Sequence, residues 1–80
     1  MQRYSTKGVC SSGIEFDVKD NIIREVRFLG GCDGNLKGIS SLVIGMTPQE
    51  AARRLTGIQC GTKKTSCPDQ LSRALAEYIR

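Results

Sequence analysis

The sequence predicts a single α+β domain, in which an antiparallel β-meander of two or three strands precedes about three α-helices. Near the N-terminus, apolar and polar residues alternate, which is the period of a half-buried strand. Further along the chain, the apolar period changes to 3.6 residues and is punctuated by helix start signals. A length of 80 residues leaves room for one small domain, residues 1–80, and no second.

The first two strands are predicted between residues 14 and 29. Ile14, Phe16 and Val18 alternate with charged residues, so they form the buried face of one strand. A second extended run covers residues 22–29. The segment 3–7 is expected to add a shorter edge strand.

The loop between these two strands determines which side chains share a face. A two-residue turn at Asp20–Asn21 would leave the strongest apolar residues of the second strand facing away from those of the first. A three-residue loop over residues 19–21, which pairs Val18 with Ile22, brings the apolar faces together. Because register follows the hydrophobic pattern, we predict the three-residue loop, with Asn21 left-handed at a bulge.

The first helix is predicted after the paired glycines at residues 30–31. Leu36, Ile39 and Val43 follow helical spacing, and Asp33 or Asn35 can cap the start.

Two further helices have complete start signals. In the segment 47–50, Thr47 caps the helix, Pro48 takes its first position and Glu50 closes a capping box. The segment 66–69 starts the last helix in the same manner. Its predicted buried stripe consists of Leu71, Leu75, Tyr78 and Ile79.

Composition excludes several classes of site. The chain has 12 Lys and Arg, 8 Asp and Glu and no histidine, giving a net charge of +4. Without histidine, the chain cannot form a Ser-His-Asp or Cys-His catalytic system or a Cys₂His₂ or His₃ metal site. It also shows no signal peptide and no apolar stretch long enough to span a membrane, so we expect a cytoplasmic protein with no membrane partner.

Two basic doublets offer one alternative function. Arg53–Arg54 and Lys63–Lys64 would form a basic face for a nucleotide or nucleic acid, although such doublets usually mark a solvated surface. Only two Phe and two Tyr are present to stack on bases, which argues against a nucleic-acid partner.

The cysteines are the strongest candidates for a functional site. Cys10, Cys32, Cys60 and Cys67 all fall in predicted loops or at the ends of elements, where they can meet. Cys67 opens the last helix, where unpaired N–H groups favour a thiolate. Three interpretations stay open: four thiolates hold one zinc, Cys60 and Cys67 form a thiol–disulfide pair, or the thiols share no role. We favour zinc.

Two motifs carry a family resemblance. Residues 65–69 read TSCPD and residues 30–35 read GGCDGN. They resemble the signature and the second motif of the TSCPD domain family, and the chain looks like a small stand-alone member. The positions of Cys10 and Cys60 are similar to the remaining cysteine positions of the family.

The resemblance implies a link to ribonucleotide reduction, and thus to DNA biosynthesis. TSCPD domains also occur as C-terminal appendages of adenosylcobalamin-dependent ribonucleotide reductases, and small members often carry a ribonucleoside-diphosphate reductase label. The ten-stranded barrel of such a reductase cannot fit in 80 residues. We therefore expect an accessory domain whose partner is a ribonucleotide reductase or another redox protein. A homo-oligomer is left open, and catalytic activity of the chain is not decided.

Overall fold

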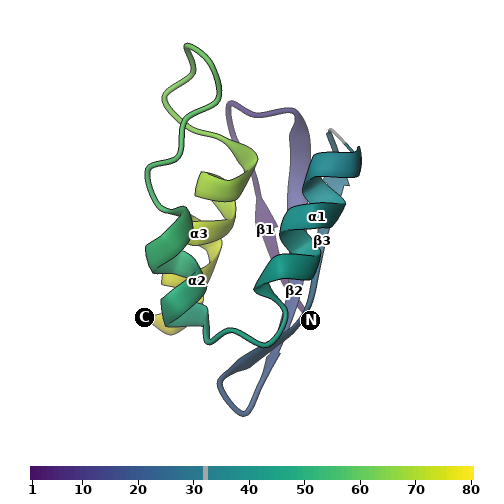
Figure 1. Cartoon of the computed structure of the whole chain (residues 1–80), viewed down its shortest axis with the longest axis vertical. Helices are drawn as coiled ribbons and strands as arrows, with labels where there is room; N and C mark the ends of the chain where they lie inside the picture. Colours follow the sequence, from purple (N-terminus) through teal and green to yellow (C-terminus); the bar gives the residue numbers. More distant parts are fainter. Residues whose placement is uncertain (32) are drawn as a thin grey trace.

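The meander precedes the helices, as predicted (Figure 1). The structure is a computed structural model and describes residues 1–31 and 33–80. The antiparallel sheet has the order β1-β2-β3 and is formed by β1 (Gln2–Ser5), β2 (Ser11–Lys19) and β3 (Ile22–Gly30). The helices are α1 (Asp33–Val43), α2 (Pro48–Leu55) and α3 (Cys67–Ile79). The predicted α+β class is confirmed.

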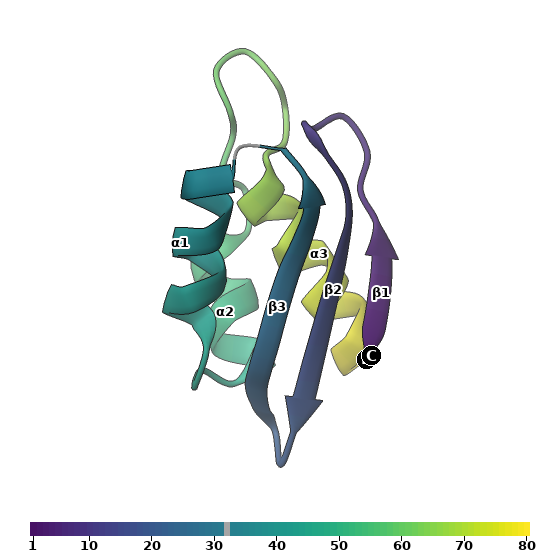
Figure 2. The ribbon, with the colours of Figure 1, turned by 90° about the vertical axis from the view of Figure 1, so that its right-hand side faces the viewer.

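The helices cover one side and one edge of the sheet. Helix α3 crosses behind one face of the sheet and packs against α2, whereas α1 runs beside β3 (Figures 1 and 2). The core lies between these layers. Its buried side chains are Ile14, Phe16, Ile23, Val26, Val43, Ala51, Leu71, Ala74 and Leu75. None of the helices in the described ranges is long and apolar enough to cross a membrane.

The stripe of α3 ends earlier than predicted. Leu71 and Leu75 are fully buried, but Tyr78 and Ile79 are each 41% exposed. The rings of Tyr78 and Phe16 pack edge to face, with 5.8 Å between their centroids. One edge-on contact leaves much of its ring in solvent, so Tyr78 borders the core without entering it.

The turn between β2 and β3 is one residue shorter than predicted. Lys19 pairs with Ile22, so only Asp20 and Asn21 form the turn. Both have positive φ angles, 55° and 59°. Two left-handed residues give a turn whose twist matches that of the flanking strands. The prediction of a left-handed Asn21 is confirmed, and the prediction of a loop over residues 19–21 is wrong.

A β-bulge restores the agreement between the apolar faces. Asp17 pairs with Glu25 and Val18 with Ile23, which leaves Arg24 as an extra residue in β3. The extra residue shifts the rest of β3 by one position, so the side chains beyond it change face. The apolar pairs that result are Phe16 with Val26 and Ile14 with Phe28.

The predicted caps of α2 and α3 are confirmed. The hydroxyl oxygens of Thr47 and Ser66 each accept a hydrogen bond from a backbone N–H in the first turn, both at 3.1 Å. The predicted capping box at α2 is not completed. The Glu50 carboxylate binds Arg53, at 2.5 Å, and Arg54 on its own helix, and these two partners lower the pKa of Glu50 to about 2.

The turn length can be tested by replacing each turn residue with valine. We expect Asp20→Val and Asn21→Val each to lower the free energy of unfolding by about 1–3 kcal/mol, because β-branched residues are strained at positive φ. Lys19→Val, which changes an exposed strand position, is the control. Denaturant unfolding measures all three. Wild-type stability in Asp20→Val would contradict a turn made of Asp20 and Asn21.

Candidate thiol site

Two cysteines that are far apart in the sequence have neighbouring sulfur atoms. Cys10 precedes β2 and is exposed, whereas Cys67 is the first residue of α3 and is only 6% exposed. Their Sγ atoms lie 3.7 Å apart. The Oγ atom of Ser11 lies 3.2 Å from the Cys67 Sγ atom and is a second polar neighbour. Packing of the sheet on α3 therefore creates a thiol pair.

Gly31 leaves room for this pair. Its φ angle is 87°, and a Cβ atom at this position would lie 3.1 Å from the Cys10 Sγ and 2.8 Å from the Cδ1 of Leu36. Both distances are shorter than ordinary contacts, so a side chain would displace its neighbours. The second glycine of the GGC sequence is thus a point where the backbone closely approaches a sulfur atom. Cys32, the predicted metal ligand that follows it, lies outside the described residues.

Ser66 fastens the long loop over residues 56–66 to α3. Its hydroxyl donates a hydrogen bond to the backbone carbonyl of Ile58, at 2.6 Å, and accepts one from the backbone N–H of Asp69. One side chain therefore caps the helix and holds the loop. Cys67 follows it directly, so the same contacts position the Cys67 thiol.

Asp69 holds the loop at two more points. The residue is 3% exposed, and its carboxylate accepts hydrogen bonds from the Gly57 N–H, at 2.7 Å, and from the Thr65 hydroxyl, at 2.5 Å. Arg73, one turn further along α3, pairs with it at 3.0 Å. Burial raises the pKa of Asp69, but the hydrogen bonds and the Arg73 charge together lower it below its usual value. Asp69 is thus an acidic residue in the first turn of α3, and its hydrogen bonds join the loop to the helix.

Sequence reasoning missed Gln70. This side chain is 1% exposed, and its Nε2 donates to the Thr65 hydroxyl at 3.0 Å. Its Oε1 accepts from the backbone N–H of Lys7 at 3.2 Å, which connects α3 to the segment that leads to Cys10. Glutamine is usually a surface residue of helices, so no sequence signal distinguishes it from an exposed one.

A cavity of about 350 Å³ lies beside the thiol pair. Cys10, Cys60 and Cys67 all line it, together with apolar residues of α1 and of the loop over residues 56–66. Cys60 is exposed, and no hydrogen bond joins its thiol to Cys67 in the described part of the chain. Residues 1–31 and 33–80 contain no group of three Cys, Asp or Glu side chains placed to hold a metal ion. Of the four predicted ligands, the structure pairs Cys10 with Cys67 and places Cys60 on the same cavity.

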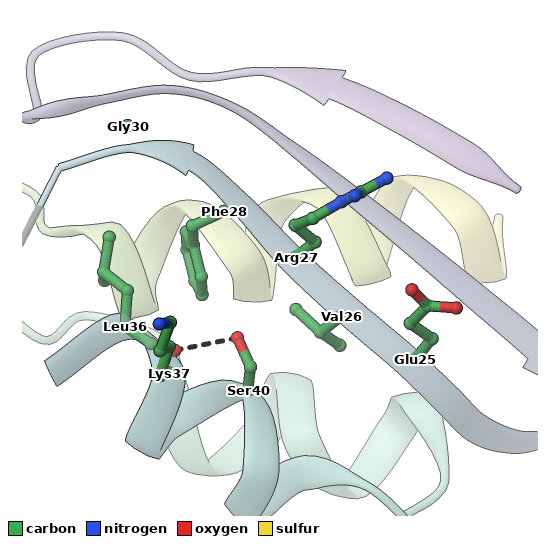
Figure 3. Close-up of a pocket in the computed structure, with 8 residues that line it drawn as sticks. All are labelled: Glu25, Val26, Arg27, Phe28, Gly30, Leu36, Lys37 and Ser40. Atoms are coloured by element: carbon green, nitrogen blue, oxygen red, sulfur yellow. Dashed lines mark hydrogen bonds between the residues drawn. The ribbon is translucent and has the colours of Figure 1, made fainter. Parts of the chain in front are cut away.

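A second cavity, of about 360 Å³, lies between β3 and α1 (Figure 3). Phe28 and Leu36 supply its apolar surface. The Ser40 hydroxyl donates to the Leu36 carbonyl at 2.8 Å, and Arg27 binds Glu15 at 2.8 Å. The hydroxyl of Ser40 and the guanidinium of Arg27 thus already have partners within the protein, and none of the cysteines among residues 1–31 and 33–80 lines this cavity. The cavity beside the thiol pair is therefore the better candidate for chemistry.

The two basic doublets lie in different elements. Arg53 and Arg54 belong to α2 and pair with Glu50, whereas Lys63 and Lys64 are exposed in the loop over residues 56–66. The carboxylate of Glu50 offsets part of the positive charge of α2. A basic face for nucleotides stays a prediction.

Comparison with known proteins supports the motif assignment. The model of the TSCPD domain family matches residues 2–79, which is nearly the whole chain. No curated protein and no solved structure shows a match. The matched range includes the thiol pair, the loop over residues 56–66 and all three strands.

The carboxylate tie should make stability depend on pH. Because the folded pKa of Asp69 lies below the value of about 3.9 in an unfolded chain, its stabilisation is complete above that value. It is lost as the pH falls through the folded pKa. We expect Asp69→Asn to lower the free energy of unfolding by about 1–3 kcal/mol at neutral pH. Below neutral pH, this free energy should then fall less steeply than in wild type. Urea unfolding in steps from neutral pH to about pH 3 measures this. The exposed Asp17→Asn variant is the control, and an acid profile of Asp69→Asn equal to wild type would contradict the tie.

Two effects of a side chain at residue 31 on the free energy of unfolding can be measured separately: the close contact with sulfur and the strained backbone conformation. Gly45 has a similar φ angle, 92°, but open space around its Cβ position. Gly45→Ala therefore measures the backbone cost alone. We expect Gly31→Ala to lose about 1–3 kcal/mol more than Gly45→Ala in denaturant unfolding, because its methyl group overpacks against Cys10 and Leu36. Equal losses in the two variants would show that the contact carries no cost.

Proposed function

The chain belongs to the TSCPD domain family, and we propose that it is a thiolate metal-binding module, with zinc as the metal, that works as an accessory domain. One observation supports the metal most directly, the 3.7 Å between the Sγ atoms of Cys10 and Cys67. With zinc–sulfur bonds of about 2.3 Å in a tetrahedral site, two ligand sulfurs lie about 3.8 Å apart. The pair thus fits one edge of a zinc–thiolate tetrahedron.

The surroundings of the pair suit a bound thiolate. The Ser11 hydroxyl, 3.2 Å from the Cys67 sulfur, is placed to donate a hydrogen bond to it, as outer-shell groups of metal sites do. Cys32, which follows Gly31, and Cys60, which lines the same cavity, are the candidates for further ligands. Since the chain has no histidine, its other ligands are limited to thiolates and carboxylates.

Metal binding here would stabilise a small fold. Cys10 and Cys67 are 57 positions apart, so a metal that joins them links the start of β2 to the start of α3. Structural zinc contributes about 10–16 kcal/mol in small domains, which often need such a staple.

The proposed accessory role rests on the family. The resemblance connects the TSCPD domain, which matches residues 2–79, to ribonucleotide reductases, where such domains are C-terminal appendages. We propose a partner in ribonucleotide reduction, to which this chain docks as a stable module.

The same pair of sulfurs favours thiol–disulfide exchange as a second candidate function. Cys10 and Cys67 would form a bond of about 2.05 Å, and their two electrons and two protons would reduce a disulfide of the partner protein to two thiols. This assigns the redox pair to Cys10 and Cys67, in place of the Cys60–Cys67 pair expected from the sequence.

Metal content distinguishes the two functions. We expect about one zinc per wild-type chain by elemental analysis, loss of the metal in Cys10→Ser and Cys67→Ser, and a lower Tm after chelation. Ser12→Ala, at an exposed neighbouring position, should keep the metal. A metal-free wild type of full stability would contradict the zinc module. In that case, a reversible mass decrease of about two hydrogens on oxidation, abolished in both cysteine variants, would favour the redox function.

A further inference from the structure

The outer edge of β3 is covered along only part of its length. The N–H of Ile23 donates to the Met46 carbonyl at 2.8 Å, and the Ile23 carbonyl accepts from the Gly45 N–H at 3.0 Å. The connection between α1 and α2 therefore occupies this edge at the start of β3. In the sheet that the described residues form, the order β1-β2-β3 makes β3 the last strand on this side.

Val26 and Phe28 turn their backbone hydrogen-bonding groups to this edge. The carbonyl of Leu29 faces β2, where it accepts from the Ser12 hydroxyl at 3.1 Å. Successive residues of a strand direct their N–H and C=O groups to opposite edges, and the pairing of β3 with β2 has no shift over residues 25–29. Val26 and Phe28 therefore face away from β2. In the part of the chain that the structure describes, no backbone bond outside the helices and strands reaches either residue.

The cavity of about 360 Å³ lies along these open groups (Figure 3). It contacts the consecutive residues 25–28 of β3 and, on its other side, Leu36, Lys37 and Ser40 of α1. Because side chains of consecutive strand residues point to opposite faces, a cavity that contacts all of them lies at the edge of the strand. Its volume is within the range of binding pockets. We call this cavity the edge groove.

We propose that the edge groove binds an extended segment of a partner protein as a fourth, antiparallel strand. Val26 and Phe28 would each donate one backbone hydrogen bond to the segment and accept one from it. None of the cysteines in the described ranges lines the groove, so this inference does not depend on the proposed metal. The accessory domain would thereby have a surface for docking.

The side chains of β3 define the chemistry of the segment. Residues opposite each other in an antiparallel pair share a face, so the segment residues that pair with Phe28 and Val26 point toward α1 and should be apolar (Figure 3). The residue between them lies opposite Arg27, and the residue after them lies opposite Glu25, both of which are exposed. Opposite charges at such positions stabilise a sheet. The expected order in the segment is therefore apolar, acidic, apolar, basic.

Arg27 can bind a carboxylate of the segment and keep its partner within the chain. It pairs with Glu15 through one nitrogen atom, at 2.8 Å, whereas a guanidinium has five N–H donors. The same charge argues against a second copy of this chain as the occupant. Two β3 strands paired through both open residues would align Val26 with Phe28 across a two-fold axis and place Arg27 opposite Arg27. Like charges directly opposite each other destabilise a sheet.

A capped peptide of sequence TVEVKT tests the pairing with the full chain, by fluorescence anisotropy and amide hydrogen exchange. We expect the peptide to slow exchange at Val26 and Phe28 and to leave Arg27, whose N–H lies in the ladder with β2, unchanged. N-methylation of the first valine removes a bond to β3 and should weaken binding about tenfold or more. N-methylation of the glutamate, whose N–H points away from β3, is the matched control and should retain binding.

Two further comparisons test the register and the location. The charge-exchanged peptide TVKVET should bind about fivefold more weakly, because it places like charges opposite Arg27 and Glu25. Ser40→Trp should fill the groove and lose binding. Ser41→Trp, at an exposed neighbouring position of α1, should retain it.

The opposite results would overturn the inference. Equal effects of the two N-methyl groups would exclude strand pairing, and equal affinities for the two charge arrangements would exclude the register. Binding that Ser40→Trp leaves intact would exclude the edge groove. Slow exchange at Val26 and Phe28 without peptide, together with a dimer in sedimentation, would identify a second copy as the occupant. Failure of the folded wild type to bind TVEVKT would overturn the proposal, whereas a metal-free chain that binds it would overturn only the zinc module.

Discussion

The buried carboxylate of Asp69 is the interaction on which the thiol end of the molecule depends. Burying a charge is costly unless hydrogen bonds and an opposite charge offset it, and here Gly57, Thr65 and Arg73 do so. Two of these partners, Gly57 and Thr65, belong to the loop over residues 56–66, so the loop cannot separate from α3 without taking two hydrogen bonds away from the Asp69 carboxylate. The position of Cys67 and the wall of the cavity both follow from this restraint.

Polar and apolar contacts are divided between two regions of the fold. The apolar core lies between the sheet and the helices, whereas the β1–β2 connection, the end of β3 and the start of α3 gather at one end of the molecule (Figure 1). Gln70 joins two of these segments through Lys7 and Thr65. Side-chain hydrogen bonds thus order an end where apolar burial is sparse, which gives the thiols fixed neighbours.

In the β2–β3 hairpin, one extra residue in β3 reconciles the preferred turn with the alternation of apolar residues. Asp20 and Asn21 favour a two-residue turn, while the alternating apolar residues demand a parity that such a turn breaks. The bulge at Arg24 satisfies both, since it shifts one strand by a single position. An arginine in a strand has no distinctive signal for a bulge, and the pattern alone therefore favoured a longer loop.

Local signals in the sequence were sufficient for the order of strands and helices, for the caps Thr47 and Ser66, and for the family motif. Capping and alternation depend on neighbours within a few residues, so a sequence can specify them alone. The pairing of sulfurs was decided by the tertiary structure. Cys60 is nearer to Cys67 in sequence, yet Cys10 lies beside it, because the loop is tied to α3 and the sheet packs against the start of that helix. Distance along the chain does not determine which loop ends meet.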